Sequence, residues 1–143
     1  MKWFTACLGA CLLITGCATS TIETRKQERY NVYSELPPDQ KAAVDSGQIK
    51  VGMSMDAVYV AWGKPSQIVS GESSSGSTVT WLYHGTYLQE YRYWTYQNYC
   101  YGRGYYAAPS LAFDYYPRSY VSAEVVFAEG KVKEWRSLPQ PRY

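Results

Sequence analysis

A short helix with both of its ends encoded in the sequence lies between Ile49 and Pro65. Ser54 is suited to be its N-cap, because a hydroxyl oxygen can accept hydrogen bonds from the backbone N–H groups that a first turn leaves unpaired. Gly63 can adopt the left-handed conformation that ends a helix, and Pro65 prevents the helix from resuming. We therefore expect the folded part of the chain to be organised around this helix, which by itself indicates no function.

A second short helix is predicted from Pro38 to Gly47, because Pro in the first turn and Gly at the end are typical helix boundaries. After Pro65 the apolar pattern changes to a period of two, which indicates half-buried strands. A short strand is predicted at Gln67–Ser70, followed by a flexible Ser/Gly linker at Gly71–Ser77.

Two further strands are predicted by alternation, one through Val79, Trp81 and Tyr83 and one from Val121 to Phe127. Glu129-Gly130 predicts a tight turn, after which Lys131–Arg136 returns as the last strand. Val132 and Trp135 are out of phase on a flat strand, so we expect a bulge or a twist between them. The expected fold is α+β, with two short N-terminal helices packed on one face of a small antiparallel sheet of three to four strands.

The N-terminus has the pattern of an export signal. Lys2 supplies the positive charge, and the apolar run from Trp3 to Ile14 is too short to span a bilayer as a stable helix. The run ends at Ile14-Thr-Gly-Cys17, which resembles a bacterial lipobox, where the cysteine is acylated and the peptide is cut just before it. A plain signal peptide and a short membrane helix are the alternatives. Ala18 follows the cysteine, and by resemblance this residue directs a lipoprotein to the periplasmic face of the outer membrane.

These features divide the chain into four parts. Residues 1–16 are the expected signal peptide, and residues 17–36 are the lipidated Cys17 with a flexible spacer, because this polar segment lacks a sustained apolar stripe. Residues 37–138 form the expected domain, with an insertion at about 94–119, and residues 139–143 are a tail. Acidic and basic residues nearly balance and the basic ones are scattered, which argues against a nucleic-acid partner.

Three motifs of the domain, in their order and spacing, resemble the SmpA/OmlA (BamE-like) outer-membrane lipoproteins. The first runs from Gln48 to Val58 and continues to Trp62-Gly-Lys-Pro65, the second is Trp81-Leu-Tyr83, and the third is Val125 to Val132. The resemblance implies a small BamE-like domain, with an architecture similar to β-lactamase inhibitory proteins, that binds protein partners and is not an enzyme. Its motif positions, with a structural role implied, are Gly52, Met53, Gly63, Pro65, Trp81, Tyr83, Phe127 and Gly130.

A Tyr-rich insertion departs from the family pattern. Alternation from Tyr87 to Tyr93 predicts an extended sheet edge, whereas Gln97 to Arg118 is expected to be a loop. Tyr, Trp and Arg are enriched where proteins bind, because large amphipathic side chains give contact area at low entropy cost. The alternative is an inert loop. The residues expected to bind a partner are Tyr99, Tyr101, Arg103, Tyr105 and Tyr106.

Little in the sequence suggests catalysis or a cofactor. Cys100 and His84 are the single cysteine and histidine of the domain, and neither lies in a recognisable catalytic context. We expect the Cys100 thiol to be sheltered, the alternative being an intermolecular disulfide. One Cys and one His are too few for a metal site unless scattered carboxylates contribute. No cofactor is expected beyond the covalent lipid on Cys17.

The sequence thus predicts a non-catalytic outer-membrane lipoprotein that acts as a periplasmic protein-binding scaffold. The resemblance implies a role in the assembly of outer-membrane β-barrels or in envelope integrity, with the β-barrel assembly machinery as a possible partner. One alternative is a peptidoglycan or glycan binder, in which Tyr and Trp rings stack on sugars. A third is an inhibitor-like lipoprotein that uses the Tyr-rich segment, by analogy of fold alone.

Overall fold

The computed structural model describes residues 20–73 and 76–142, and the expected signal peptide and lipidation site at Cys17 lie outside this part of the chain. It contains four helices and one antiparallel sheet of four strands in the order β1-β2-β3-β4. The α+β class is therefore confirmed. The elements are α1 Ile22–Glu28, α2 Tyr30–Glu35, α3 Pro38–Asp45, α4 Met55–Trp62, β1 Gln67–Ser73, β2 Gly76–Tyr101, β3 Gly104–Ala128 and β4 Lys131–Ser137.

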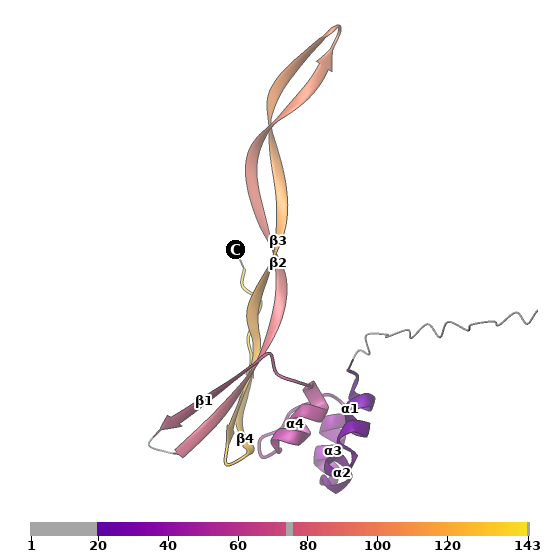
Figure 1. The fold of residues 1–143 in the computed structure, drawn as a ribbon, viewed down its shortest axis with the longest axis vertical. Coiled ribbons are helices and arrows are strands. Elements are labelled where there is room, and N and C mark those ends of the chain that lie inside the picture. The colour runs from indigo at the N-terminus through magenta and orange to yellow at the C-terminus, as the bar shows by residue number, and fades with distance from the viewer. Residues whose placement is uncertain (1–19, 74–75, 143) are drawn as a thin grey trace, which may run out of the picture.

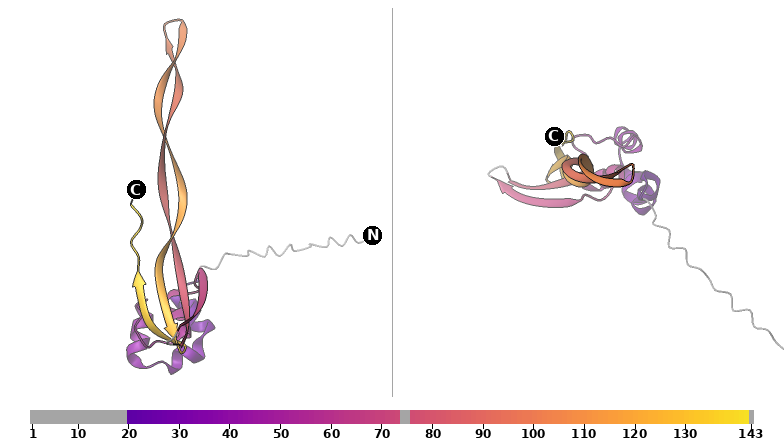
Figure 2. Two further views of the ribbon diagram at one scale, coloured as in Figure 1. Left: turned by 90° about the vertical axis from the view of Figure 1, so that its left-hand side faces the viewer. Right: turned by 90° about the horizontal axis from the view of Figure 1, so that it is seen from above.

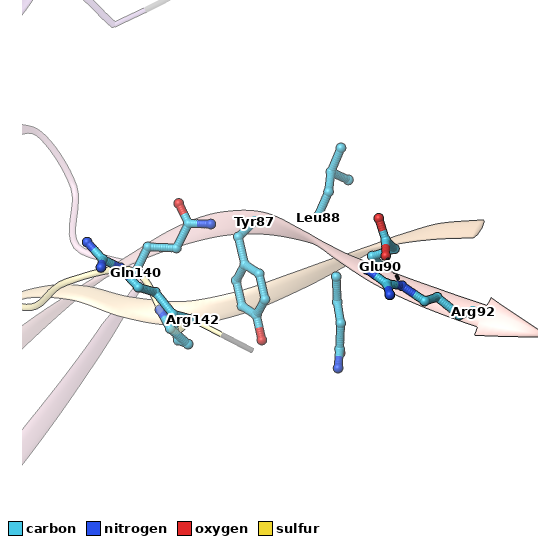
Figure 3. A pocket seen from close by; sticks show the side chains of 8 residues that line it. Tyr87, Leu88, Glu90, Arg92, Gln140 and Arg142 are labelled. Carbon is cyan, nitrogen blue, oxygen red and sulfur yellow. Dashed lines mark hydrogen bonds and ion pairs between the residues drawn. The ribbon is translucent and has the colours of Figure 1, made fainter. Parts of the chain in front are cut away.

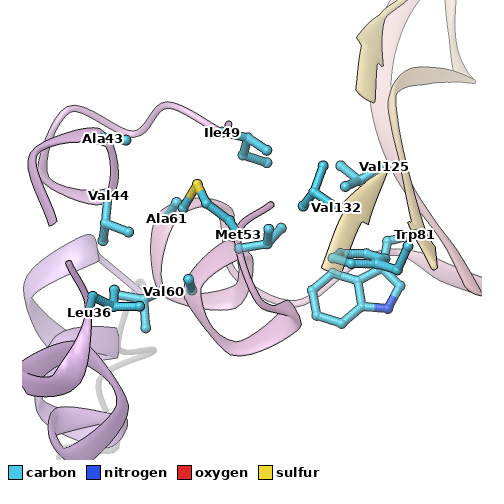
Figure 4. Packing of buried hydrophobic residues seen from close by; sticks show 13 residues of the cluster. Leu36, Ala43, Val44, Ile49, Met53, Val60, Ala61, Trp81, Val125 and Val132 are labelled. Atoms are coloured by element: carbon cyan, nitrogen blue, oxygen red, sulfur yellow. The ribbon is translucent and has the colours of Figure 1, made fainter. Parts of the chain in front are cut away.

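Helix α4 begins and ends where the sequence predicts. The hydroxyl oxygen of Ser54 accepts a hydrogen bond from the N–H of Ala57 at 3.2 Å, and Gly63 ends the helix with a φ of 85°. Val58 and Val60 of this helix are fully buried. They belong to one core cluster with Val44 of α3 and with Trp81, Val125, Phe127 and Val132 of the strands, several of which are labelled in Figure 4.

Helices α1 and α2 correct one prediction, since residues 17–36 were expected to be a flexible spacer. The segment lacks an apolar stripe, but Arg25 anchors it from α1: its Nε donates to the carbonyl oxygen of Val60 at 2.9 Å and its Nη2 to that of Ala61 at 3.0 Å. These carbonyls lie in the last turn of α4, where helix geometry leaves them without partners. A buried charge therefore helps to order the segment, together with Leu36 in the core cluster and Tyr33 packed against it.

The strands predicted at the two edges of the sheet are present. Two segments that were predicted to be connections are strand instead. The tight turn at Glu129-Gly130 is present, with both residues at positive φ, and Lys133 is the extra residue of a bulge, since Phe127 pairs with Val132 and Val126 with Glu134. The expected linker at residues 71–77 is instead largely strand, because β1 extends to Ser73 and β2 begins at Gly76.

The second failure is larger, because the expected loop between Gln97 and Arg118 is sheet. Strands β2 and β3 pair from Thr78 opposite Ala128 to Tyr101 opposite Gly104, with one bulge at Ser122, opposite the step from Tyr83 to His84. At 26 and 25 residues they far exceed the usual length of about 3–10. None of the residues of this insertion is fully buried, so the burial pattern that identifies a strand in a sequence is missing there.

The outer part of this hairpin, residues 84–101 of β2 and 104–121 of β3, is called here the ribbon, and the rest of the described chain is called the base. Figure 1 shows the ribbon rising as a twisted pair of strands away from the helices, and Figure 2 shows the same from the side. Strand β1 pairs with β2 up to Leu82, and β4 pairs with β3 only from Ala123 onwards. At about 3.3 Å per residue the ribbon extends roughly 55 Å.

Candidate binding surface on the ribbon

A two-residue turn closes the ribbon. Tyr101 pairs with Gly104, and Gly102 has a φ of 61° while Arg103 is not in the positive region. This combination is that of a type II′ turn, whose twist matches that of the strands it joins. The turn fixes the register, so that each residue of β2 faces a known residue of β3.

The even-numbered residues of β2 and the odd-numbered residues of β3 share one side, called here the apolar face. Its residues from Thr86 to Cys100 and from Tyr105 to Ser119 are all exposed. Trp94 is 72% exposed and lies opposite Leu111, and Tyr96 is 75% exposed and lies opposite Pro109. The large apolar side chains of this face are Leu88, Trp94, Tyr96, Tyr105, Leu111, Phe113 and Tyr115. The apolar face is therefore a long solvent-exposed surface that no other part of the described chain covers.

The opposite side is called here the tyrosine face, because tyrosines alternate on it with polar side chains. Tyr91 and Tyr93 stack with ring centroids 6.1 Å apart, and Tyr91 meets Tyr116 edge-on at 6.5 Å. A hydrogen bond to Asp114 raises the pKa of Tyr93 above its usual value. Several residues of this face are half-buried by their neighbours, so it is less exposed than the apolar face.

The five residues predicted to bind a partner meet at the tip of the ribbon. Tyr99 and Tyr106 face each other across the strands, with stacked rings 5.6 Å apart. Tyr101 and Tyr105 are more than 80% exposed, and Arg103 is exposed in the turn between them. The structure thus brings these residues together at the end of the ribbon that lies farthest from the helices.

One ion pair interrupts the apolar face near the middle of the ribbon. Arg92 Nε donates to Glu90 Oε1 at 2.5 Å, and the hydroxyl of Tyr115 donates to Glu90 Oε2 at 3.2 Å. The bond from Arg92 is the main reason why the pKa of Glu90 lies below its usual value. The guanidinium of Arg92 also lies over the Phe113 ring at 5.8 Å. Two opposite charges two residues apart are therefore held on one side of β2.

The expected shelter of Cys100 is wrong, because this free thiol is exposed beside the tip. It faces Tyr105 across the strands, where no second layer covers the ribbon. His84 lies at the other end of the ribbon, sixteen steps along the same strand, so the two side chains are roughly 50 Å apart. They cannot form a nucleophilic pair within one chain.

An open groove of about 530 Å³ lies at the root of the ribbon. Tyr87, Leu88, Gln89, Glu90 and Arg92 of β2 form one wall, and Gln140, Pro141 and Arg142 of the C-terminal segment form the other. Figure 3 shows Gln140 and Arg142 beside Tyr87, with Glu90 and Arg92 further along the strand. The sequence did not indicate this groove, because the tail carries no motif.

The family-motif residues lie in the base and hold the loop before α4 against β4. The N–H of Gly52 donates to the carbonyl of Val132, and the N–H of Val132 donates to the carbonyl of Met53, both at 2.8 Å. Met53, Phe127 and Trp81 are buried, as is Pro65. The hydroxyl of Tyr83 donates to the carbonyl of Gly63 at 3.1 Å, and Gly130 has a φ of 73° in the last turn. All eight positions therefore serve the fold.

The apolar face was missed by sequence reasoning, which selected the tip alone. The signal that could have found it is Gly102-Arg103, since a Gly-X pair between two aromatic runs is typical of a two-residue hairpin turn. Folding the two runs back about this turn brings Trp94 opposite Leu111 and Arg92 opposite Phe113.

No family model, curated protein or solved structure matches the chain. Within residues 20–73 and 76–142, no group of three or more His, Cys, Asp or Glu side chains is placed to hold a metal ion. None of the helices in that same part of the chain is both long and apolar enough to cross a membrane.

Proposed function

We propose that this chain is a non-catalytic outer-membrane lipoprotein, anchored through Cys17 at the periplasmic face, that presents the ribbon as a protein-binding element. The observation that carries the proposal is the cluster of exposed Tyr and Arg side chains at the tip. Such residues dominate binding energy at protein interfaces, because they bury large areas with few rotatable bonds. The partner would be another protein of the cell envelope.

The resemblance to the SmpA/OmlA (BamE-like) family makes the β-barrel assembly machinery the first partner to test. The proposal includes the finer fold assignment, in which the base is a BamE-like domain with its helices on one face of the sheet. The motif residues from Gly52 to Pro65 and from Trp81 to Gly130 support it by their roles in the base. The ribbon is then an addition to that scaffold, reaching a partner at a distance from the membrane anchor.

Two experiments in living cells test this proposal. Radioactive palmitate should label the wild-type chain and not the Cys17→Ser variant. A photoreactive amino acid at Tyr101 should crosslink to a second envelope protein, whereas the same amino acid at Val51, which is 68% exposed on the base, should not. An unlabelled chain would refute the anchor, and equal crosslinking from both positions would refute binding by the tip.

The tyrosine face favours a second candidate, the binding of a glycan such as peptidoglycan. Sugar rings stack on aromatic rings, and polar side chains such as Gln89 and Asp114 next to Tyr91 could accept hydrogen bonds from hydroxyl groups. This function predicts that the protein is retained on purified cell-wall sacculi and that Tyr91→Ala with Tyr93→Ala releases it. Unchanged retention by the double variant would exclude the tyrosine face as the site.

A further inference from the structure

The turn at the tip determines which backbone groups of the ribbon point outwards. In a two-residue hairpin the residues that flank the turn exchange both hydrogen bonds, so Tyr101 and Gly104 form such a pair. Pairs then alternate along the ribbon, and the even-numbered residues of β2 direct their N–H and C=O groups away from β3. Pro109 and Pro117 fit this alternation, because both occupy odd positions of β3, where no N–H is needed for pairing.

The base gives independent support for this direction. The carbonyl of Leu82 accepts from the N–H of Ser66 at 2.9 Å, and the N–H of His84 donates to Ser66 Oγ at 3.1 Å. The even-numbered groups of β2 therefore point to the side on which β1 lies. Strand β1 stops pairing at Leu82, so beyond Ser66 the same edge of β2 continues without a neighbouring strand.

The two edges of the ribbon differ in how they are protected. Proteins commonly block an edge with Pro or Lys, which prevent pairing with another chain. The β3 edge has Pro109 and Pro117 at outward positions, whereas residues 84–101 of β2 contain neither Pro nor Lys. In the described part of the chain, no strand pairs with the β2 edge beyond Leu82. The β2 edge is thus the open one.

We propose that the β2 edge pairs with the β2 edge of a second copy of this chain, in antiparallel orientation, to form a sheet in the order β3-β2-β2-β3. The inference rests on the proposed function of the ribbon as a binding element and names one partner for it. An isolated two-stranded hairpin is at best marginally stable in water, and pairing of two ribbons supplies the missing strands. A two-fold axis relates the copies, so one surface satisfies both.

The charges of Glu90 and Arg92 favour one register of the pairing between the two β2 strands. With Tyr91 on the two-fold axis, Glu90 of each chain lies opposite Arg92 of the other, and both residues have outward backbone groups, which makes them a hydrogen-bonded pair. A shift to the neighbouring register in one direction places Glu90 opposite Glu90, and a shift in the other direction places Arg92 opposite Arg92. Like charges directly opposite each other destabilise a sheet, so both neighbours are disfavoured.

The same register also matches the rest of the apolar face. Leu88 lies opposite Trp94 of the second copy, and Thr86 lies opposite its Tyr96. Pairing extends from Gly85 to Gln97 and stops before His84, whose N–H already donates to Ser66 Oγ. Almost the whole outward edge of β2 in the ribbon is then paired. The exposed apolar side chains lie beside those of the second copy on a sheet of four strands in place of two.

Disulfide formation tests the register in the full chain. All variants also carry Cys100→Ser. The chain with Cys100→Ser alone is the control for crosslinking through the remaining thiols. Tyr91→Cys lies on the two-fold axis and should give a disulfide-linked dimer in oxidant-treated cells. Gln89→Cys and Tyr93→Cys, on the same face, should each give about tenfold less, because a disulfide requires Cα atoms within about 7 Å. Co-expression of these two chains should restore the crosslink. Absence of the Tyr91→Cys dimer, or equal crosslinking at all three positions, would overturn the proposal.

Charge reversal separates the contact between chains from the ion pair within one chain. Glu90→Arg and Arg92→Glu should each weaken the dimer about tenfold, because two like-charge pairs then face each other. A mixture of the two variants should form heterodimers with wild-type affinity. In such a heterodimer the two substituted side chains face each other with opposite charges, although each chain by itself keeps two like charges. Sedimentation velocity of the detergent-purified chains measures this. Recovery only in the Glu90→Arg/Arg92→Glu double variant, and not in the mixture, would refute the contact.

The outcomes distinguish this inference from the proposed function. Crosslinks from Tyr101 to a different envelope protein, without a Tyr91→Cys dimer, would refute self-pairing and leave the binding function standing. A Tyr91→Cys dimer without crosslinks to any other protein would support self-pairing and refute a different partner at the tip.

Discussion

At the scale of single residues, Arg25 is the charge on which the N-terminal helices depend. It is 7% exposed and donates to the carbonyl oxygens of Val60, Ala61 and Ser20. Those of Val60 and Ala61 carry the negative end of the α4 dipole, so a guanidinium both satisfies and neutralises them. The interaction joins α1 to the end of the helix around which the base is built.

Replacement of Arg25 by Met should therefore destabilise the base by about 3 kcal/mol, because charge-assisted bonds to buried carbonyls are lost. The free energy of unfolding in urea measures the change. Arg29→Met is the matched control: Arg29 pairs with Asp56 at 2.8 Å on the surface, with both side chains 47% exposed, and should cost less than about 1 kcal/mol. Equal costs for the two variants would mean that α1 is not anchored by Arg25.

Tyr83 links the root of the ribbon to the end of α4. Its hydroxyl donates to the carbonyl of Gly63, and its ring meets that of Trp62 edge-on at 5.3 Å. Burial raises the pKa of Tyr83 well above its usual value. The folded state therefore holds this proton more tightly than the unfolded state does.

The sign of the pH dependence follows from this difference. The contribution of Tyr83 to stability is complete below the unfolded pKa of about 10 and is lost as the pH rises above it. We expect the Tm of the wild-type protein to fall between about pH 9 and 11 more steeply than that of Tyr83→Phe, which has no proton to lose. Identical slopes in thermal unfolding monitored by circular dichroism would contradict this assignment.

At the scale of elements, the ladder of the ribbon can be tested by adjacent proline substitutions. Asn98 has an outward N–H, whereas the N–H of Gln97 points to β3, opposite Ala108. Asn98→Pro should leave the hairpin paired, because proline is accepted where no ladder bond is made. Gln97→Pro should open the tip and raise hydrogen exchange at residues 99–106 about tenfold or more, because a ladder bond and the local geometry are lost. The opposite ranking would mean that the register is shifted by one residue.

The elements differ in how far the sequence could predict them. Ser54 and Gly63 are local signals for α4, and alternation at Ala123, Val125 and Phe127 marks a strand with one buried face, so both were predictable. Helices α1 and α2 were not, because Arg25 acts through carbonyls that come close only after folding. The Tyr91 to Tyr101 part of β2 has no buried face, so the only local signal for its pairing is the Gly-X pair at Gly102-Arg103.

The residues of the candidate site also divide into those that the sequence could predict and those that it could not. The tip residues Tyr99 to Tyr106 were predictable as a group, since their residue types alone favour binding. The apolar face was not, because Trp94 and Leu111 become neighbours only when the register is known. Exposure of Cys100 was missed for the same reason: a thiol in a compact loop could be covered, whereas one on a two-stranded ribbon cannot.

At the scale of the whole molecule, the base and the ribbon are energetically separate. Among the described residues, the core cluster and the hydrophobic residues packed against it include none between His84 and Ser122. The base has its own sheet of four strands at the root, where β1 and β4 flank β2 and β3. Stability should therefore come from the base, and association from the ribbon.

Two shortened chains test this separation, each closed by Asn-Gly between residues that form a hydrogen-bonded pair. Replacement of residues 88–117 joins Tyr87 to Arg118 and removes nearly the whole ribbon. The base should remain folded, with a free energy of unfolding within about 1 kcal/mol of the parent, because an isolated hairpin contributes little by itself. Both the dimer and the crosslinks to envelope proteins should be lost.

Replacement of residues 96–109 joins Thr95 to Ser110 and removes only the tip. This chain keeps Glu90, Tyr91 and Arg92, so it should still give the Tyr91→Cys dimer, although a shorter edge binds more weakly. It lacks the tip tyrosines, so a photoreactive residue at Trp94 should crosslink to another envelope protein in the full chain and not in this one. If the tip-deleted chain lost the dimer as completely as the ribbon-deleted chain, self-association would belong to the tip. The ribbon would then have a single binding region at its tip. The charges of Glu90 and Arg92 indicate a second one on the β2 edge, and that result would contradict it.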